Sequence, residues 1–311
     1  MSWEKEIEEL KLRQKFAKQM GGKEKVARHV NAGKLTVRDR IDKFLDENSF
    51  EEVGSTTGRA EYDADGNLVD MQPANLITGR GRVNGKRVVV AGDDFTVRGG
   101  ANDAGIREKL IHVESMAGSL QLPLVRLVDG TGGGGSVKTI ETEGRTYVPE
   151  VRGWDVVIDN LSKVPVVAMA LGSTAGLGAA RVAASHYSVM VKETSQMFVA
   201  GPPVVARTGE ILTKNELGGS DIHTRNGAVD DEAKSEEEAF EKVRRFLSYL
   251  PPSVFELPER LETDDDPNRR EEWLIDAIPR DARKVYKMRK IIEATVDKDS
   301  FFEIGKKWGR S

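Results

Sequence analysis

Apolar and polar residues alternate along the middle of the chain in a pattern that predicts helices between buried strands. Apolar residues recur at helical spacing in three segments, at about residues 103–116, 153–161 and 175–185. Each segment is followed by a short, largely apolar run, and these runs lie at residues 122–128, 164–170 and 188–191. Strands that are apolar on both faces and separated by helices are typical of a parallel sheet covered on both sides. We therefore predict an α/β fold.

Helix and hairpin signals flank this region. An amphipathic helix is predicted over residues 2–20, and its apolar stripe contains Trp3, Ile7 and Leu10. Asn84-Gly85 is the strongest two-residue turn signal in the chain and predicts a β-hairpin. A further helix is predicted over residues 236–250, because Ser235 and Glu238 have capping-box spacing just before an apolar run.

Residues 289–310 repeat residues 38–59 without a gap. Nine of the 22 aligned positions are identical in the two copies, and in the first copy they are Arg38, Ile41, Asp46, Ser49, Phe50, Glu52, Gly54, Gly58 and Arg59. Two unrelated helix–turn–strand segments of similar composition are the alternative, but we interpret the match as a tandem duplication. Its second copy has barely begun at Ser311.

The duplication divides the chain into three predicted parts. Residues 1–252 form a whole domain, residues 253–280 are a polar, proline-containing linker, and residues 281–311 are the truncated start of a second domain. If an active site lies between the two copies, we expect that this chain alone does not complete it.

Composition excludes several classes of protein. The 311 residues contain 38% hydrophobic and 32% charged residues, and no apolar run is long enough to predict a membrane span. The charged N-terminus lacks the apolar core of a signal peptide, and cysteine is absent, so we expect a cytoplasmic protein without disulfides or cysteine-bound zinc. The net charge is −4 and no basic stripe with aromatic residues is present, which argues against nucleic acid as a partner.

A glycine-rich motif follows the first predicted parallel strand. Gly130, Gly132 and Gly135 match G-x-G-x-x-G, but no apolar helical stripe follows, as a dinucleotide-binding turn requires. Ser136 stands where a P-loop would need lysine. Either a glycine loop over a ligand or a simple long turn would explain the motif.

The segment ALGSTAGLGAA, residues 170–180, joins a predicted strand to a predicted helix. Such a junction directs free backbone N–H groups and the positive end of the helix dipole to one place. Small side chains there would let an oxyanion reach those donors, although close packing of helix on sheet would also explain them. Ser173 directly follows Gly172, so the segment is not a G-x-S-x-G nucleophile elbow.

No other constellation indicates acid, base or metal chemistry. The four histidines have no spaced carboxylate or second histidine that would suggest a metal site, and no Ser-His-Asp arrangement is evident. Chemistry without such groups favours catalysis by backbone donors together with a cofactor.

Four stretches together resemble one family, the β subunits of propionyl-CoA, acetyl-CoA and methylcrotonyl-CoA carboxylases. The stretches are residues 33–54 (GKLTVRDRIDKFLDENSFEEVG), 77–100, 190–230 and 288–305. The long, ungapped stretch at 190–230 is the most specific of them. The resemblance spans nearly the whole chain and agrees with the duplication.

The resemblance implies two tandem domains of the crotonase-like (ClpP/crotonase) fold, each a spiral of ββα units, assembled in intact members as trimers of dimers. It implies that the first domain binds an acyl-CoA, and that a partner's second domain binds carboxybiotin from a carrier subunit. Carboxyl transfer to a short acyl-CoA follows, without a metal. The implied oxyanion donors are the backbone amides at Gly176 and Leu177, with Gly178 adjacent. The implied acyl-CoA contacts are Arg98, Gly99, Gly100, Gly132, Gly133 and Ala175.

The sequence also departs from the family pattern. Leu177 interrupts the usual Gly-Gly of the oxyanion turn, and residues 130–135 lack the usual Ser-Gly-Gly-Ala continuation. The absence of cysteine excludes the zinc ribbon of bacterial acetyl-CoA carboxylase β subunits.

We expect a carboxyltransferase that works with a biotin carboxylase, a biotin carrier subunit and the missing C-terminal half. Three alternatives stay open: a biotin-dependent decarboxylase subunit, a crotonase-type hydratase or isomerase, and a CoA-binding half-chain that is inactive without its other half. Against the hydratase, no suitably placed pair of glutamates follows the oxyanion turn.

Overall fold

The computed structural model describes residues 2–101, 106–130, 141, 144 and 152–309. Within them, a seven-stranded sheet has the order β1–β4–β5–β6–β7–β9–β11. The strands from β5 to β11 are mutually parallel, whereas β1 and β4 join the sheet in antiparallel pairs. The strands are β1 (Glu51–Glu52), β4 (Leu76–Val83), β5 (Lys86–Asp93), β6 (Leu124–Val128), β7 (Val166–Ala170), β9 (Tyr187–Val191) and β11 (Asp231–Ala233).

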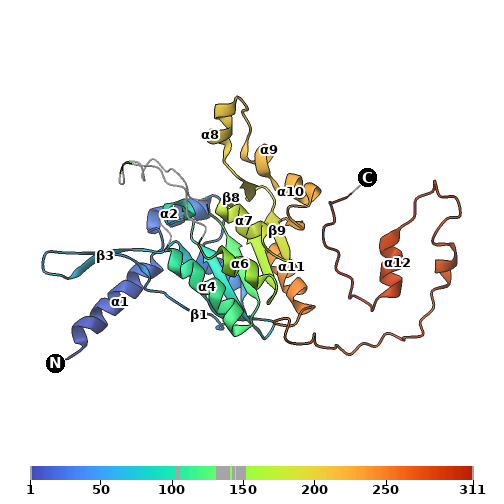
Figure 1. Cartoon of the computed structure of the whole chain (residues 1–311), viewed down its shortest axis with the longest axis horizontal. Helices are drawn as coiled ribbons and strands as arrows, with labels where there is room; N and C mark the ends of the chain where they lie inside the picture. The colour runs from blue at the N-terminus through green and yellow to red at the C-terminus, as the bar shows by residue number, and fades with distance from the viewer. Residues whose placement is uncertain (1, 102–105, 131–140, 142–143, 145–151, 310–311) are drawn as a thin grey trace. The chain divides into compact units, whose positions relative to one another are not determined.

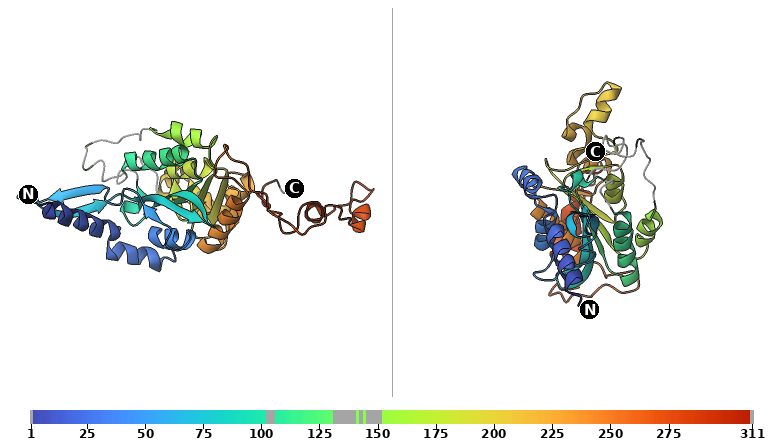
Figure 2. Two further views of the ribbon diagram at one scale, coloured as in Figure 1. Left: turned by 90° about the horizontal axis from the view of Figure 1, so that it is seen from below. Right: turned by 90° about the vertical axis from the view of Figure 1, so that its left-hand side faces the viewer.

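Helices cover both faces of this sheet (Figures 1 and 2). One face carries α4 (Arg107–Leu120), α6 (Trp154–Asn160) and α7 (Leu177–Ala183), and the other carries α3 (Val37–Phe44) and α11 (Glu236–Ser248). Every residue of β6, β7 and β9 is buried, which explains why these strands are largely apolar, with Arg126 of β6 and Ser188 of β9 as exceptions. The predicted α/β fold with a covered parallel sheet is confirmed.

The predicted hairpin is the pair β4–β5, and its turn explains the Asn-Gly sequence. Asn84 has φ 50° and Gly85 has φ 79°, the positive values that a type I′ turn needs at both central positions. The Asp46 carboxylate accepts hydrogen bonds from the amides of both residues, at 2.9 and 2.7 Å. The segment after α3 is thereby fixed to the tip of the hairpin.

Smaller elements surround the main sheet. The predicted first helix is α1 (Glu4–Lys18), but Trp3 stays 74% exposed, so the predicted apolar stripe is not a core face. A second sheet pairs β8 (Ser173–Ala175) with β10 (Gln196–Phe198) in parallel. Sequence analysis missed a hairpin and four short helices: β2 (Gly58–Tyr62), β3 (Leu68–Pro73), α2 (Lys23–Asn31), α8 (Pro202–Val205), α9 (Lys214–Gly218) and α10 (Ser220–Asn226).

The chain divides into two compact units. The first contains residues 1–257 and 305–311, and the second contains residues 258–304. The second unit contains the short 3₁₀ helix Glu272–Asp276 and α12 (Met288–Thr295). Among the helices that the structure describes, none is long and apolar enough to cross a membrane.

Lys109 of α4 is buried and predicts a pH dependence of stability. Its Nζ donates a hydrogen bond to the Gly54 carbonyl at 2.9 Å, and burial lowers its pKa to about 8. The unfolded chain keeps its proton up to about pH 10.5. Between about pH 8 and 10.5 the unfolded state therefore binds more protons, so the free energy of unfolding should rise with pH, by on the order of 3 kcal/mol.

Urea titrations at several pH values measure this effect. The rise attributable to Lys109 should disappear in Lys109→Met and persist in Lys234→Met, which removes an exposed lysine instead. An unchanged slope in Lys109→Met would show that another group causes the rise.

Candidate functional site

The candidate site lies at the edge of the sheet where two neighbouring parallel strands end. Asp129 and Gly130 directly follow β6, and Leu171 and Gly172 directly follow β7. Ligands of open α/β sheets bind outside the carboxyl ends of the strands. From this edge the chain continues through β8 and Gly176 into α7.

The turn before α7 leaves backbone donors without acceptors. The Ala175 amide donates to the Gly130 carbonyl at 3.2 Å, and the Gly176 amide donates to the Phe198 carbonyl at 3.1 Å. The first α-helical bond runs from the Ala180 amide to the Gly176 carbonyl. The amides of Leu177 and Gly178 therefore have no hydrogen-bond acceptor among the described residues, as is usual for the first turn of a helix.

Two separate features favour glycine at this turn. Gly176 has φ 56° and ψ −120°, a conformation in the positive-φ region that side chains rarely adopt. Gly178 lies against the backbone, because a Cβ there would be 3.3 Å from the Gly130 carbonyl oxygen and 3.2 Å from Thr174 Cγ2. The small residues of the predicted oxyanion segment thus allow the Gly130 backbone to come close to the turn and α7 to pack closely on the sheet.

The loop at Arg98, Gly99 and Gly100 also reaches this edge. A Cβ on Gly100 would be 2.6 Å from Gly130 Cα, so the two backbones are in direct contact. The structure therefore brings the Arg98–Gly100 segment and Ala175 together around Gly130. The other two predicted acyl-CoA contacts, Gly132 and Gly133, lie outside the described residues.

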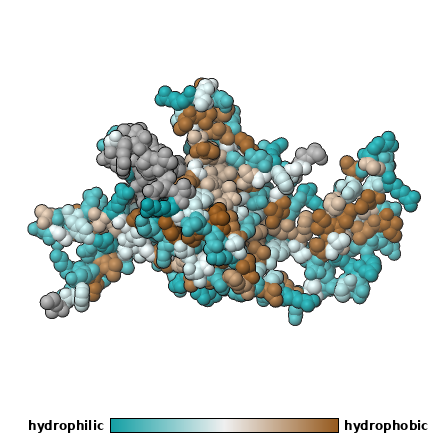
Figure 3. All heavy atoms as spheres, in the orientation of Figure 1, coloured by the Kyte–Doolittle hydropathy of each residue, from teal (hydrophilic) through white to brown (hydrophobic). Residues whose placement is uncertain are grey.

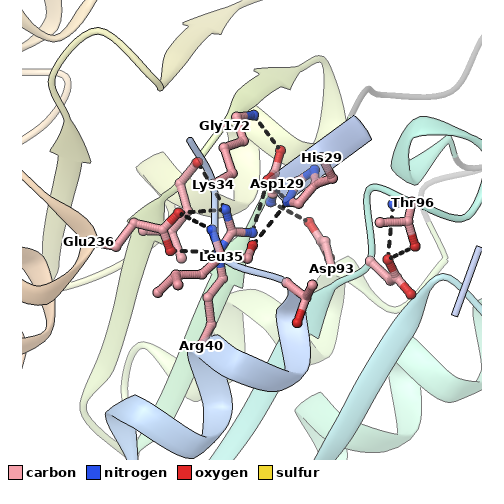
Figure 4. A network of polar contacts seen from close by, with 12 residues as sticks. His29, Lys34, Leu35, Arg40, Asp93, Thr96, Asp129, Gly172 and Glu236 are labelled. Carbon is pink, nitrogen blue, oxygen red and sulfur yellow. Dashed lines mark hydrogen bonds and ion pairs between the residues drawn. The ribbon is translucent and has the colours of Figure 1, made fainter. Parts of the chain in front are cut away.

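A buried network of charges lies at the same edge of the sheet, around Asp129 and Arg40 (Figure 4). Asp129, which is fully buried, accepts hydrogen bonds from Arg40 Nη1 at 2.9 Å and Lys34 Nζ at 3.4 Å. Arg40 also donates through Nε to Glu236 at 2.7 Å and through Nη2 to the Leu171 carbonyl at 3.2 Å. Burial alone would lower the pKa of Arg40, but the two carboxylates raise it above its usual value.

Gly172 is part of the same arrangement. A Cβ at this position would lie 1.8 Å from Asp129 Oδ1 and 2.5 Å from Lys34 Nζ. The backbone after β7 therefore passes directly over the ion pair. Through Arg40, the network links α3 and α11 to the ends of β6 and β7.

Sequence reasoning missed this network, although a signal for it exists. Val37, Ile41 and Phe44 form the buried face of α3, and Arg40 lies on that same face. A lone arginine within an apolar helical stripe needs a buried partner. Asp129, a carboxylate at the end of an apolar strand, is the matching signal.

A second buried pair anchors α7 to the sheet. Arg181 Nη1 lies 3.1 Å from Asp93 Oδ1, and the other oxygen of Asp93 accepts the Asp129 amide at 3.3 Å. Arg126 forms a buried salt bridge with Glu114 at 2.9 Å and donates to the Arg181 carbonyl at 3.0 Å. These contacts therefore fix the C-terminal half of the short helix to the sheet.

The backbone donors of the site can stabilise negative charge. Two adjacent backbone amides at the start of α7 have no acceptor among the described residues, and preorganised donors of this kind can stabilise an oxyanion. Among the described residues, no group of three or more histidine or carboxylate side chains could hold a metal ion.

Comparison with known proteins shows the family to which the chain belongs. Residues 28–311 match the family model described as the carboxyl transferase domain. The chain is 32% identical over 308 residues to the propionyl-CoA carboxylase carboxyltransferase subunit of Haloferax mediterranei, covering 98% of this chain and 58% of that one. It is 29% identical over 288 residues to the methylmalonyl-CoA decarboxylase subunit alpha of Veillonella parvula, covering 91% and 55% of the two chains.

Among solved structures, the chain resembles transcarboxylase 12S, whose structure contains methylmalonyl-CoA and forms a hexamer. The TM-score is 0.82 at 26% identity, covering 99% of this chain and 59% of that one. The predicted crotonase-like fold is confirmed. The chain spans less than two thirds of these relatives, and it belongs to the carboxyl transferase domain family, as its resemblance to the carboxylase β subunits predicts.

Proposed function

We propose that this chain is the acyl-CoA-binding half of the carboxyltransferase component of a biotin-dependent acyl-CoA carboxylase. The transferred carboxyl group would go to the α-carbon, or the vinylogous carbon, of a short acyl-CoA. The observation that carries the proposal is the pair of unpaired amides at Leu177 and Gly178, at a turn where Gly100, Gly130 and Gly176 bring backbone close together.

The two amides hold the thioester oxygen as negative charge develops on it. They sit at the positive end of α7 and are already oriented, so they need no rearrangement during the reaction. Gly176 does not serve as a donor here, because its amide already donates to the Phe198 carbonyl. That bond instead fixes the turn that aims the next two amides.

The buried charges keep this turn in place. Arg40 and Lys34 hold the Asp129 carboxylate, Asp129 precedes Gly130, and the Gly130 carbonyl accepts the Ala175 amide. A displacement of Gly130 would therefore move the start of α7. We assign Arg40, Lys34 and Asp129 positioning roles, and no proton transfer.

The Arg98–Gly100 segment and Ala175 would line the path of the acyl-CoA. Carboxybiotin, carried by a separate subunit, would supply the carboxyl group. The partners we propose are a biotin carboxylase, its biotin carrier and a second carboxyltransferase half, within a homo-oligomer. The hexamer of transcarboxylase 12S supports the last point.

Calorimetric titration of the full chain tests the proposal. Acetyl-, propionyl- and methylcrotonyl-CoA should each be compared with free CoA, and saturable binding that favours one thioester is the expected result. A folded chain that binds none of them at millimolar concentration, even after a second carboxyltransferase half is added, would refute an acyl-CoA site.

A further inference from the structure

Three arginines are buried among the described residues, and one of them differs from the other two. Arg40 is 1% exposed, Arg126 is 0% exposed and Arg181 is 8% exposed. Arg40 and Arg126 donate hydrogen bonds through all three guanidinium nitrogens. Arg181 donates through Nη1 to Asp93 Oδ1 at 3.1 Å. Its Nε and Nη2 are shielded from water and have no acceptor in the part of the chain that the structure describes.

The two unpaired nitrogens form the edge of the guanidinium group that binds carboxylates elsewhere in this chain. In Arg126, Nε and Nη2 donate to the two carboxylate oxygens of Glu114, both at 2.9 Å. In Arg40, the same two nitrogens donate to the two oxygens of Glu236, at 2.7 and 2.9 Å. Parallel N–H groups on this edge match a carboxylate, and buried donors without an acceptor are unfavourable. The acceptor that suits Arg181 is therefore a carboxylate.

Arg181 lies beside the candidate site. It follows Gly178 by three residues, so the two share a face of α7 and are about 5 Å apart along the helix axis. Asp93, which holds Arg181, also accepts the Asp129 amide at 3.3 Å. A Cβ on Gly130 would lie 3.5 Å from the same oxygen of Asp93. The guanidinium group is thus held next to Gly130, around which the site is built.

The balance of buried charge indicates how a carboxylate would arrive. Arg126 is paired with Glu114, and Arg181 is paired with Asp93, so the charges already cancel. A further carboxylate adds a negative charge and loses its own hydration, so a free carboxylate ion should bind weakly. A carboxylate that belongs to a ligand held elsewhere at the site binds more readily, because its pairing is then an intramolecular event.

The two flanks of the turn before α7 differ in polarity. On one flank, the Phe198 carbonyl accepts the Gly176 amide, and the chain continues into α8 with Val199 90% and Val204 60% exposed. Apolar side chains gather over α8 in Figure 3. Arg181 and its carboxylate partner lie on the other flank. An acyl group with one charged end would therefore direct that end toward Arg181.

We propose that Nε and Nη2 of Arg181 bind the free carboxylate of a malonyl-type acyl-CoA, in which one carbon separates the carboxylate from the thioester. The short separation follows from the helix, because the Leu177 and Gly178 amides precede Arg181 by about one turn. Since the two nitrogens are shielded from water, binding requires a local shift of the atoms that cover them.

This inference rests on the proposed function, under which a malonyl-type thioester is the product of carboxyl transfer. Arg181 would then be the residue that distinguishes the carboxylated acyl-CoA from the uncarboxylated one. It binds and orients the carboxylate, and we assign it no proton transfer.

Calorimetric titration of the full chain with two matched ligands tests this role, with the second carboxyltransferase half added if acyl-CoA binding requires it. The ligands are malonyl-CoA and acetoacetyl-CoA, which carries a methyl ketone of nearly the same size in place of the carboxylate. Malonyl-CoA should bind the parent chain about tenfold more tightly or better, because it adds two charge-assisted hydrogen bonds. In Arg181→Gln, the two Kd values should become nearly equal, and the Kd for acetoacetyl-CoA should stay unchanged.

Two further variants separate the guanidinium edge from charge and from folding. Arg181→Lys keeps a cation beside Asp93 but lacks the paired N–H groups, so its preference for malonyl-CoA should be intermediate. Arg207→Gln removes an exposed arginine on the α8 flank and should leave both Kd values unchanged.

The comparison of ligands on the parent chain needs no variant, so it decides the question even if Arg181→Gln does not fold. Equal Kd values for the two ligands would overturn the role of Arg181 and leave the acyl-CoA site standing. An equal loss of affinity for both ligands in a folded Arg181→Gln chain would also overturn it, because Arg181 would then act on the CoA moiety or on the fold. Failure of both thioesters to bind would overturn the proposed function together with this inference.

Discussion

Replacing Arg40 with methionine is expected to lower the free energy of unfolding by about 3–5 kcal/mol. Methionine fills most of the space of the arginine stem, so loss of packing contributes little. The large effect comes from the two buried carboxylates, Asp129 and Glu236, which lose their salt bridges with Arg40, while Asp129 keeps its longer contact with Lys34 at 3.4 Å. An uncompensated buried charge is among the few causes of so large a loss from one substitution.

Urea-induced unfolding at constant pH measures this loss. Arg28→Met is the matched control, because Arg28 forms a salt bridge with Glu24 while its side chain is 75% exposed. That pair should contribute no more than about 1 kcal/mol, as exposed ion pairs do. If Arg40→Met lost as little as the control, the buried network would not be what joins α3 and α11 to the candidate site.

A second variant shows whether the charge of Asp129, or only the size of its side chain, contributes to the free energy of unfolding. Asp129→Asn keeps the size of the side chain but removes its charge, and Glu236 still pairs with Arg40. It should therefore destabilise the chain less than Arg40→Met. The reverse order would indicate that Lys34, which also contacts Asp129, depends on that charge more than Arg40 does.

The parts of the fold that sequence predicted are those in which local pattern and tertiary environment agree. Apart from Arg126, residues 124–128 and 166–170 are apolar because helices cover both sides of them, so their burial can be predicted from their composition. Asn84-Gly85 predicts its own turn because few other residues tolerate positive φ at both positions. Where an element has such a local cause, the sequence alone was sufficient to predict it.

The missed elements depend on contacts that are remote in sequence. The β2–β3 hairpin has only two buried residues, Leu68 and Met71, and β3 packs against α1, so no apolar strand pattern marks it in the sequence. At Ser235 the expected cap is present, but Glu238 reaches the Lys234 amide instead of completing a capping box with Ser235. The hydrogen bond from the Lys234 amide to Glu238 could be seen only in the folded structure.

The candidate site shows the same division. The strand-to-helix junction at Gly176 was predictable, because small residues after a buried strand have a local meaning. The charged residues that support this junction were not predictable from the sequence. Arg40 and Asp129 are 89 positions apart, and Arg40 and Glu236 are 196 apart. Their pairing is a property of the folded chain.

Replacing Leu177 with proline is expected to lower kcat about 10²–10³-fold in the enzyme assembled with its second half and a carboxybiotin donor. Proline lacks the N–H that we propose as an oxyanion donor. Position 177 is the first residue of α7, where proline is well tolerated and where no intrahelical bond is lost. The change therefore removes the donor and leaves the helix intact.

Leu177→Ala is the control that separates the amide from the side chain. It keeps the N–H but removes the bulk with which Leu177 interrupts the family's glycine pair, so kcat should stay near the parent value while preference among acyl chains changes. Since the donor acts on charge that develops in the transition state, KM for the acyl-CoA should change little in Leu177→Pro. Equal kcat values for the two variants, both shown to be folded by urea titration, would mean that the thioester oxygen is held elsewhere. The first turn of α7 would then be only a packing junction.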